Sequence, residues 1–254
     1  MSPVQVGPLG VAASLLLVAA AVALSWREHL GLGRSIVWSA VRAICQLLVI
    51  GAALGLVLSD DASIWWSWAW VLAMVTVGAA TVTSRSSGVP GVFLITWVAL
   101  GAAVGVSLAV VFGFGIFPYE GRALVPSAGM LMGNAIAATV LAVQRTVTEV
   151  REHRAEIEVR LALGQAGRRA LRPHLAEAMR TSITPQIEQT KIVGLIALPG
   201  TMTGLLLAGV EPLDAVLTQT VVMFLILGSV SVTSVTVGRG VARRLVTKDH
   251  RLLT

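Results

Sequence analysis

Residues 91–112 read GVFLITWVALGAAVGVSLAVVF and include no charged side chain. A run of about 20 apolar residues is long enough to cross the ~30 Å hydrocarbon core of a bilayer as a helix. Six further stretches have the same character, at residues 8–26, 36–58, 64–83, 124–144, 192–209 and 215–237. The sequence therefore predicts an all-α polytopic membrane protein with about seven transmembrane helices.

The composition agrees with this prediction. Apolar residues make up 56% of the 254 residues and charged residues 13%, which is more apolar surface than one soluble core of this length buries. We expect residues 1–254 to form a single transmembrane domain. The lone cysteine, Cys45, lies inside an apolar run and has no partner in the chain for a disulfide.

The distribution of basic residues predicts the orientation in the membrane. Nine Lys and Arg residues lie between residues 145 and 191 and five follow residue 237, whereas the connectors after the second and sixth predicted spans carry none. Basic connectors are retained in the cytoplasm. We therefore expect a multi-pass protein of the cell inner membrane with its amino terminus outside and its carboxyl terminus in the cytoplasm. The net charge of +6 is then a topology signal, and the expected surroundings are lipid rather than nucleic acid. The first stretch has an alternative interpretation as a cleaved signal peptide, although no Lys or Arg precedes it.

One charged residue, Arg42, lies inside a predicted span, with Gln46 one helical turn further along the same face. Two interpretations of Arg42 stay open: its side chain extends to the lipid headgroups, or it lines a path through the protein or binds a partner there. All 13 acidic residues fall in connectors or at the ends of spans. This placement argues against carriers that use a carboxylate buried in the membrane.

The predicted sixth span is interrupted by Pro199 and Gly200, which Met202 and Thr203 follow closely. Proline and glycine disturb the helical hydrogen bonding, and an unpaired carbonyl group in a membrane needs a partner from protein or water. The interruption is either a packed kink or a break that lines a substrate path.

Asn134 and Gln219 are amides in otherwise apolar stretches. Each side chain either forms a hydrogen bond between helices or contacts a substrate. The candidate residues for a substrate path are Arg42, Gln46, Asn134, Pro199, Gly200, Met202, Thr203 and Gln219.

The connector between residues 145 and 191 is too long for a turn. Apolar residues recur with helical spacing at Val143, Val147, Val150, Ile157 and Leu161, which predicts that the fifth span continues into the cytoplasm. Gly164 is a stop signal, and a second helix is expected over about 168–180. The connector is either a docking surface for a soluble partner or a solvated amphipathic face.

Several kinds of active site have no counterpart in the sequence. The two lysines, Lys191 and Lys248, do not follow glycine, so the chain has no phosphate-binding G-x-x-x-x-G-K-[ST] loop. The four histidines show no metal-ligand spacing, and no Ser/His/Asp pattern stands out. We therefore expect no enzymatic activity, no catalytic residue and no cofactor in this chain.

Four segments carry a family resemblance: residues 197–219, ALPGTMTGLLLAGVEPLDAVLTQ; residues 42–47, RAICQL; residues 133–135, GNA; and residues 161–164, LALG. With them the chain resembles the permease subunits of FetB-type ABC exporters, which are linked to iron export and have a plant branch linked to aluminium tolerance. The resemblance covers most of the chain. It implies a homodimeric permease that exports iron or another metal ion, with ATP and Mg bound by a cytoplasmic ABC ATPase partner.

The resemblance also implies that the connector at about 145–191 contacts the ATPase. Glu158 and Gly164 have the E-x-x-x-x-x-G spacing of importer coupling loops, but the importer I-x-L-P continuation is replaced around His174. Residues 198–205 read LPGTMTGL where the family usually reads LPGMMTGQ, which leaves the metal specificity open. The candidate coupling residues are Arg154, Glu158, Leu161, Gly164, Arg168 and Arg169.

Two other functions remain to be distinguished. A secondary carrier needs no ATPase and responds to an imposed ion gradient. A membrane scaffold that only recruits a soluble partner gives no solute flux and tolerates apolar replacements of Asn134 and Gln219.

Overall fold

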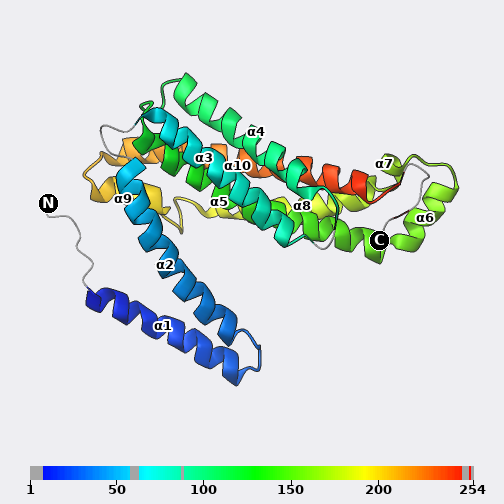
Figure 1. Cartoon of the computed structure of the whole chain (residues 1–254), viewed down its shortest axis with the longest axis horizontal. Helices are drawn as coiled ribbons and strands as arrows, with labels where there is room; N and C mark the ends of the chain where they lie inside the picture. The colour runs from blue at the N-terminus through cyan, green and yellow to red at the C-terminus, as the bar shows by residue number, and fades with distance from the viewer. Residues whose placement is uncertain (1–7, 58–62, 87–88, 248–251, 253–254) are drawn as a thin grey trace. The chain divides into compact units, whose positions relative to one another are not determined.

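The structure is a computed structural model that describes residues 8–57, 63–86, 89–247 and 252. The regular elements in these ranges are helices, together with the isolated bridges Val193–Ala197 and Val246–Leu252. The helices are α1 (Pro8–Arg27), α2 (Gly33–Val57), α3 (Ile64–Ser84), α4 (Val92–Gly113), α5 (Gly121–Glu152), α6 (Arg154–Ala162), α7 (Gly167–Ala170), α8 (Arg172–Ile192), α9 (Gly200–Leu207) and α10 (Pro212–Arg244), as labelled in Figure 1. The chain divides into two compact units, Met1–Ala62 and Ser63–Thr254.

The first unit is a hairpin of α1 and α2. Ser25 is buried near the end of α1, and its hydroxyl oxygen accepts a hydrogen bond of 3.1 Å from the backbone N–H of Leu32 in the connecting loop. Two helices enclose no core of their own, so apolar side chains of α2 such as Trp38, Leu47 and Leu48 are exposed. This surface needs cover from lipid or protein.

In the second unit, α5 and α10 lie side by side and run in the same direction, and α3 and α4 pack alongside them (Figure 1). At 1.5 Å per residue these two central helices are roughly 48 and 50 Å long, which exceeds the hydrocarbon thickness. Among the described residues, α2, α3, α4, α5 and α10 are long and apolar enough to cross a membrane, and α1 contains a shorter apolar helix. The predicted all-α polytopic membrane architecture is confirmed.

The predicted sixth span, at residues 192–209, is not among the helices of the described residues that are long enough to cross a membrane. The chain turns at residues 193–199 and forms only the short α9 afterwards, because Gly194 adopts a φ of +86° and Pro199 lies before the first residue of α9. After α7 the chain runs back along the bundle mainly in α8, which contacts both α5 and α10 and leads toward the start of α10. The hydropathy of residues 192–209 is that of a span, but the glycines and the proline prevent a continuous helix.

The helix α8 packs against two of the long helices of the second unit. Ala178 and Met179 of α8 pack against Ala142 of α5, which lies inside the predicted fifth span. Gly238 of α10 lacks a side chain where Met179 approaches, so the two helices pack closely at this point. Part of the predicted connector thus packs against α5 and α10, and its assignment as a cytoplasmic connector at about 145–191 stays a prediction.

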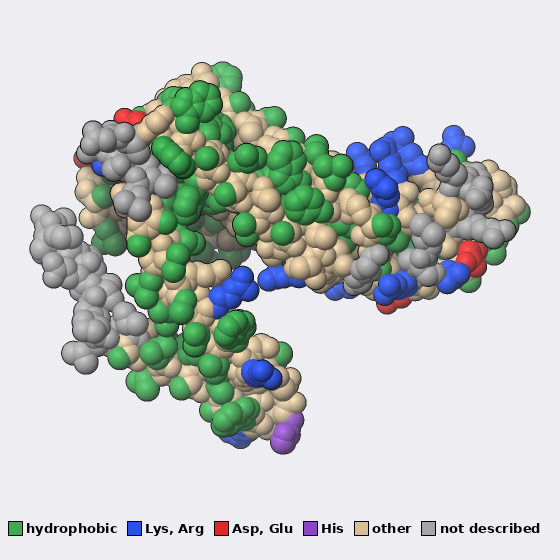
Figure 2. All heavy atoms as spheres, viewed as in Figure 1, with side chains coloured by type: hydrophobic (Ala, Val, Ile, Leu, Met, Phe, Trp, Pro, Cys, Tyr) green, Lys and Arg blue, Asp and Glu red, His purple; other side chains and the backbone are tan. Residues whose placement is uncertain are grey.

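The apolar stripe of the connector forms the core of this end of the bundle. Val143, Val147, Val150, Ile157 and Leu161 are all buried, and they belong to one cluster with residues from the ends of α4 and α10. The predicted continuation of the fifth helix beyond residue 144 is confirmed as far as Glu152, and its place in the cytoplasm stays a prediction. In the second unit, the blue Lys and Arg side chains of Figure 2 gather at the end that carries α6 and α7.

Ile157→Ala tests this core. Ile157 is fully buried on α6, and its truncation leaves a cavity, so we expect the free energy of unfolding to fall by about 2–5 kcal/mol. Val159→Ala on the same helix is the matched control, because Val159 is 59% exposed and its change should stay within about 0.5 kcal/mol. Denaturant unfolding of both variants in detergent measures the difference, and equal effects would contradict the packing.

Candidate substrate pocket and partner surface

A pocket of about 300 Å³ lies where α8 ends and the chain turns into α9. The helix α8 supplies one wall, the turn and α9 a second, and the first turns of α10 a third. None of the lining residues is charged. They are Thr190, Val193, Gly194, Leu198, Met202, Val216, Gln219, Thr220, Met223 and Phe224.

The turn beside this pocket satisfies much of its own backbone. The N–H of Gly194 donates to the carbonyl of Ala197 at 3.0 Å, and the N–H of Ile196 donates to the carbonyl of Ile192 at 3.1 Å. The first helical bond of α9 follows, from Thr203 N–H to the carbonyl of Pro199 at 3.0 Å. The predicted irregular backbone is confirmed, and it extends over residues 193–199.

Gln219 is the most deeply buried polar side chain of this pocket, with 4% of its surface exposed. Its Oε1 atom has no hydrogen-bond partner among the described residues. An unpaired buried amide oxygen costs about 1–3 kcal/mol, so the position stabilises the fold less than an apolar residue would. Met202 and Met223 also line the pocket. The pocket thus offers thioether sulfur and amide oxygen, which are neutral donors to a cation.

The structure brings two of the predicted path residues, Met202 and Gln219, into this pocket. Pro199 and Gly200 mark the start of α9 next to it, and the Thr203 hydroxyl, on an exposed residue, donates to the carbonyl of Pro199. Asn134 lies elsewhere, on α5, where its side-chain N–H donates to the carbonyl of Met130 at 2.9 Å.

Thr201, which departs from the family pattern, is also absent from the pocket lining. Its hydroxyl contacts the Sδ atom of Met130 at 3.3 Å and so joins α9 to α5. Leu205, the second departure, is likewise outside the lining. The two substitutions therefore leave the donors of this pocket unchanged.

Arg42 and Gln46 lie on α2 in the first unit, one turn apart and both exposed. Their assignment to a substrate path stays a prediction.

Sequence reasoning missed Thr190, Met223 and Phe224 as lining residues. Met223 had a usable signal, because it follows Gln219 by four residues and so shares its face of α10. Thr190 had none, since the predicted span began after it.

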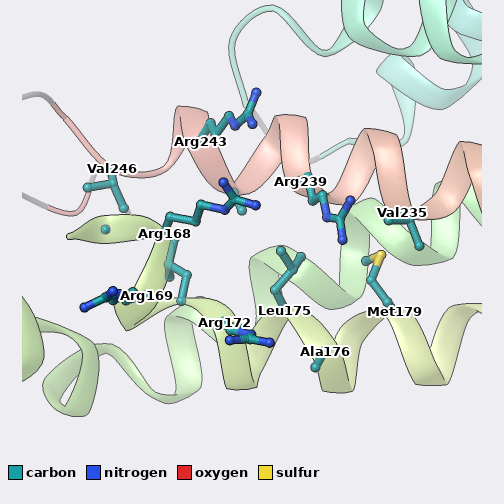
Figure 3. Close-up of a pocket in the computed structure, with 13 residues that line it drawn as sticks. Arg168, Arg169, Arg172, Leu175, Ala176, Met179, Val235, Arg239, Arg243 and Val246 are labelled. Atoms are coloured by element: carbon teal, nitrogen blue, oxygen red, sulfur yellow. The ribbon is translucent and has the colours of Figure 1, made fainter. Parts of the chain in front are cut away.

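A second hollow, of about 790 Å³, lies among α7, α8 and α10. Met179 points from α8 toward Val235 on α10, and Leu175 points from α8 toward α10 beside it (Figure 3). These side chains belong to the apolar part of the lining. Arginines surround them: Arg168, Arg169, Arg172, Arg239 and Arg243. No carboxylate of the described ranges forms a salt bridge with these guanidinium groups, so we call this region the arginine surface. It presents a positive field to an acidic ligand or partner.

The other predicted coupling residues lie on α6 and at its end. Arg154 and Glu158 form a salt bridge of 2.8 Å with each other. Gly164 follows the end of α6 with a φ of +81°, which confirms the predicted stop and favours glycine there. Leu161 is buried in the core and is not accessible to a partner in this structure, so the apolar spacing that identified it reflects packing.

The histidines are less scattered than the sequence indicated. His153, at the corner between α5 and α6, and His174, in the first turn of α8, have ring centroids 4.5 Å apart, and Glu149 lies beside them. Burial lowers the pKa of His174 below its usual value, and the neighbouring His153 lowers that pKa further. The sequence shows no metal-ligand spacing among the histidines, but the fold brings His153 and His174 together with Glu149 in a group that could hold a metal ion.

The comparisons with known proteins cover nearly the whole chain. The model of the Uncharacterised protein family (UPF0014) matches residues 8–246. The chain is 36% identical to "UPF0014 membrane protein STAR2" of Oryza sativa subsp. japonica over 91% of its own length and 80% of the rice protein. It is 31% identical to "Probable iron export permease protein FetB" of Escherichia coli over 96% of its own length and 93% of that protein. It is 33% identical to "Protein ALUMINUM SENSITIVE 3" of Arabidopsis thaliana, over 91% and 84% of the two chains. No solved structure matches the chain.

Gln219→Leu tests whether the Gln219 side chain stabilises the fold. Because Gln219 Oε1 is buried without a partner, we expect the free energy of unfolding to stay level or rise by about 1 kcal/mol. Gln189→Leu, at an exposed position of α8, is the control and should change little. Thermal unfolding in detergent measures both, and a large loss of stability in Gln219→Leu alone would show that the amide holds the fold together.

Proposed function

The chain belongs to the UPF0014 family of membrane proteins, and on that premise we propose that it is the membrane-spanning permease subunit of an ATP-driven ABC exporter. Its cargo is iron or another metal ion, which it moves out of the cytoplasm across the cell inner membrane. The FetB protein of Escherichia coli, whose name describes iron export, supports this assignment over nearly its full length.

The observation that carries the proposal is the pocket beside the interrupted backbone. Gln219 Oε1 faces no hydrogen-bond partner there, and the sulfur-bearing side chains of Met202 and Met223 line the same space. These neutral oxygen and sulfur atoms are suitable ligands for a metal ion that passes through the pocket. Because a transport site must also release its cargo, neutral donors suit it better than a cage of carboxylates, which would hold the ion more tightly.

ATP hydrolysis belongs to a separate ABC ATPase subunit, which binds ATP and Mg. The arginine surface and α6 form its docking region, and an acidic face of the ATPase complements the five arginines electrostatically. The helix α10 connects the two regions, because it carries Arg239 and Arg243 at one end and Gln219 near the other. At 1.5 Å per residue, Gln219 and Arg239 are roughly 30 Å apart along this one helix. A displacement at the docking region is thereby transmitted to the pocket.

We further propose that two copies of the permease assemble with two ATPases. The exposed apolar side chains of α2, including Leu47 and Leu48, are available for a contact between copies. A dimer would cover surface that a two-helix hairpin cannot bury by itself.

Co-purification tests the ATPase assignment. The tagged chain, extracted from its native membranes in mild detergent, should carry a stoichiometric P-loop ATPase that mass spectrometry identifies. The double variant Arg168→Glu, Arg169→Glu reverses two charges of the arginine surface and should reduce the recovered ATPase at least about tenfold, which corresponds to about 1.4 kcal/mol.

Arg122→Glu is the matched control, because it also reverses the charge of an arginine. Arg122 is in the first turn of α5, at the end of that helix away from α6, so this change should leave the ATPase bound. A permease that repeatedly purifies alone, with its fold intact, contradicts the proposal and favours a secondary carrier. An ATPase that stays bound to the double variant would place the docking region elsewhere.

A further inference from the structure

We propose that Glu149, His153 and His174, with Glu156 beside them, form a binding site for one divalent transition-metal ion at the corner between α5, α6 and α8. The site lies outside the pocket near Gln219 and goes beyond the transport function proposed above, since it assigns a regulatory ion to the connector itself.

The four side chains come from three helices and the corner that joins two of them. Glu149 is in the last turn of α5, His153 follows the end of that helix, Glu156 is in the first turn of α6 and His174 is in the first turn of α8. One ligand atom each from Glu149, His153 and His174 lies within 4.8 Å of the others. Small side-chain rotations can bring such atoms to one ion at the ~2.1 Å distance of metal–nitrogen and metal–oxygen bonds.

His174 gives an independent indication that this site binds an ion. The residue is 7% exposed, and its Nε2 atom is buried without a hydrogen-bond partner among the described residues. The nearest carboxylate oxygen, Oε2 of Glu156, is 3.7 Å away, which exceeds hydrogen-bond distance. A buried polar atom without a partner is uncommon, and an ion bound to Nε2 would satisfy it.

One nitrogen of His153 is engaged, because its Nδ1 lies 3.1 Å from the backbone carbonyl oxygen of Glu149, whereas a carboxylate oxygen of Glu156 stays available. Glu156 binds Arg160 through Oε1, so Oε2 remains directed at His174. Glu149 Oε2 lies 3.5 Å from His153 Nδ1, and the two imidazole rings are inclined by only 31°. The carboxylates and the rings therefore converge on one small region.

This donor set indicates a class of ion. Imidazole nitrogen favours first-row transition metals such as Zn²⁺, Fe²⁺, Co²⁺ and Ni²⁺, and two imidazoles with a carboxylate are a known arrangement for Fe²⁺. Mg²⁺ and Ca²⁺ prefer sites made of oxygen alone. The chain's cysteine is distant in sequence, at Cys45, so this site contains no thiolate.

A bound ion would fasten the corner of α5 and α6 to the start of α8. The helix α8 leads directly to the turn at residues 193–199, so occupancy at this corner restrains the helix that forms one wall of the pocket. The concentration of the cytoplasmic metal would thereby influence the connector without the ion entering the transport path.

Metal titration of the full chain tests the site. The protein is purified in detergent, its affinity tag is cleaved, and bound metals are removed with a chelator. Co²⁺ is then added while its visible absorption is recorded, and Zn²⁺ binding is measured by calorimetry. We expect one ion per chain, with Co²⁺ bands shifted and intensified relative to the hydrated ion.

His174→Gln and Glu149→Gln should each weaken binding by more than about tenfold, the smallest loss typical of changes around a metal site. His29→Gln is the control, because His29 is an exposed histidine in the first unit. Melting temperatures without metal verify that the variants fold, and Zn²⁺ should raise this temperature in the unaltered chain and in His29→Gln but much less in His174→Gln and Glu149→Gln.

Unchanged stoichiometry and affinity in His174→Gln would overturn the site, as would a Co²⁺ spectrum that stays that of the hydrated ion. Neither measurement involves an ATPase or solute flux, so failure of this site and failure of the proposed transport function are distinguishable.

Discussion

A bilayer interior offers the backbone no water to bind, so every N–H and C=O group at membrane depth needs a partner within the protein. The long helices meet this requirement by their own hydrogen bonds. The turn at residues 193–199 cannot, and it forms short local bonds such as that between Gly194 and Ala197. Leu195 and Ile196 of this segment are exposed, whereas Val193, Gly194 and Leu198 line the pocket around Gln219 together with residues of α8, α9 and α10.

The same arrangement links the two ends of the second unit. The helix α8 starts beside α7 and the arginine surface and ends at the pocket, and α10 runs from the pocket to that same surface. Close packing of Met179 against Gly238 holds the two helices together between these points. Since packed interiors transmit displacement rather than absorb it, a partner at the arginine surface can act on a distant pocket.

Much of the fold could be predicted from the sequence, because hydropathy and helical period reflect burial directly. The spacing of Val143, Val147 and Val150 gave the extension of α5 correctly, and Gly164 gave the end of α6. Ile157 and Leu161 belong to the same buried cluster but lie on the separate helix α6. The predicted sixth span, at residues 192–209, does not form one helix. Its hydropathy does not reveal that the chain runs back along the bundle in α8, a more polar helix. The resemblance to FetB-type permeases agreed with the family match, and it also pointed to the interrupted segment.

The candidate sites were only partly predictable. Met202 was identified because it follows the interruption at Pro199 and Gly200, and Gln219 because it is an amide in an otherwise apolar stretch. The convergence of Glu149, His153 and His174 depends on how α8 folds back, and spacing along the chain does not encode that. Arg168 and Arg169 were candidate coupling residues in the sequence, but their grouping with Arg172, Arg239 and Arg243 in one surface is visible only in the structure.

The most direct test of the central claim is metal flux in vesicles. Permease and ATPase are reconstituted together, and ⁵⁵Fe²⁺ uptake is measured in the ATPase-outward vesicles, with ATP or an ion gradient as the energy source. The account predicts accumulation that requires ATP and that Gln219→Leu reduces while the ATPase stays bound. Uptake driven by the ion gradient alone, or uptake unaffected by ATP, would contradict it.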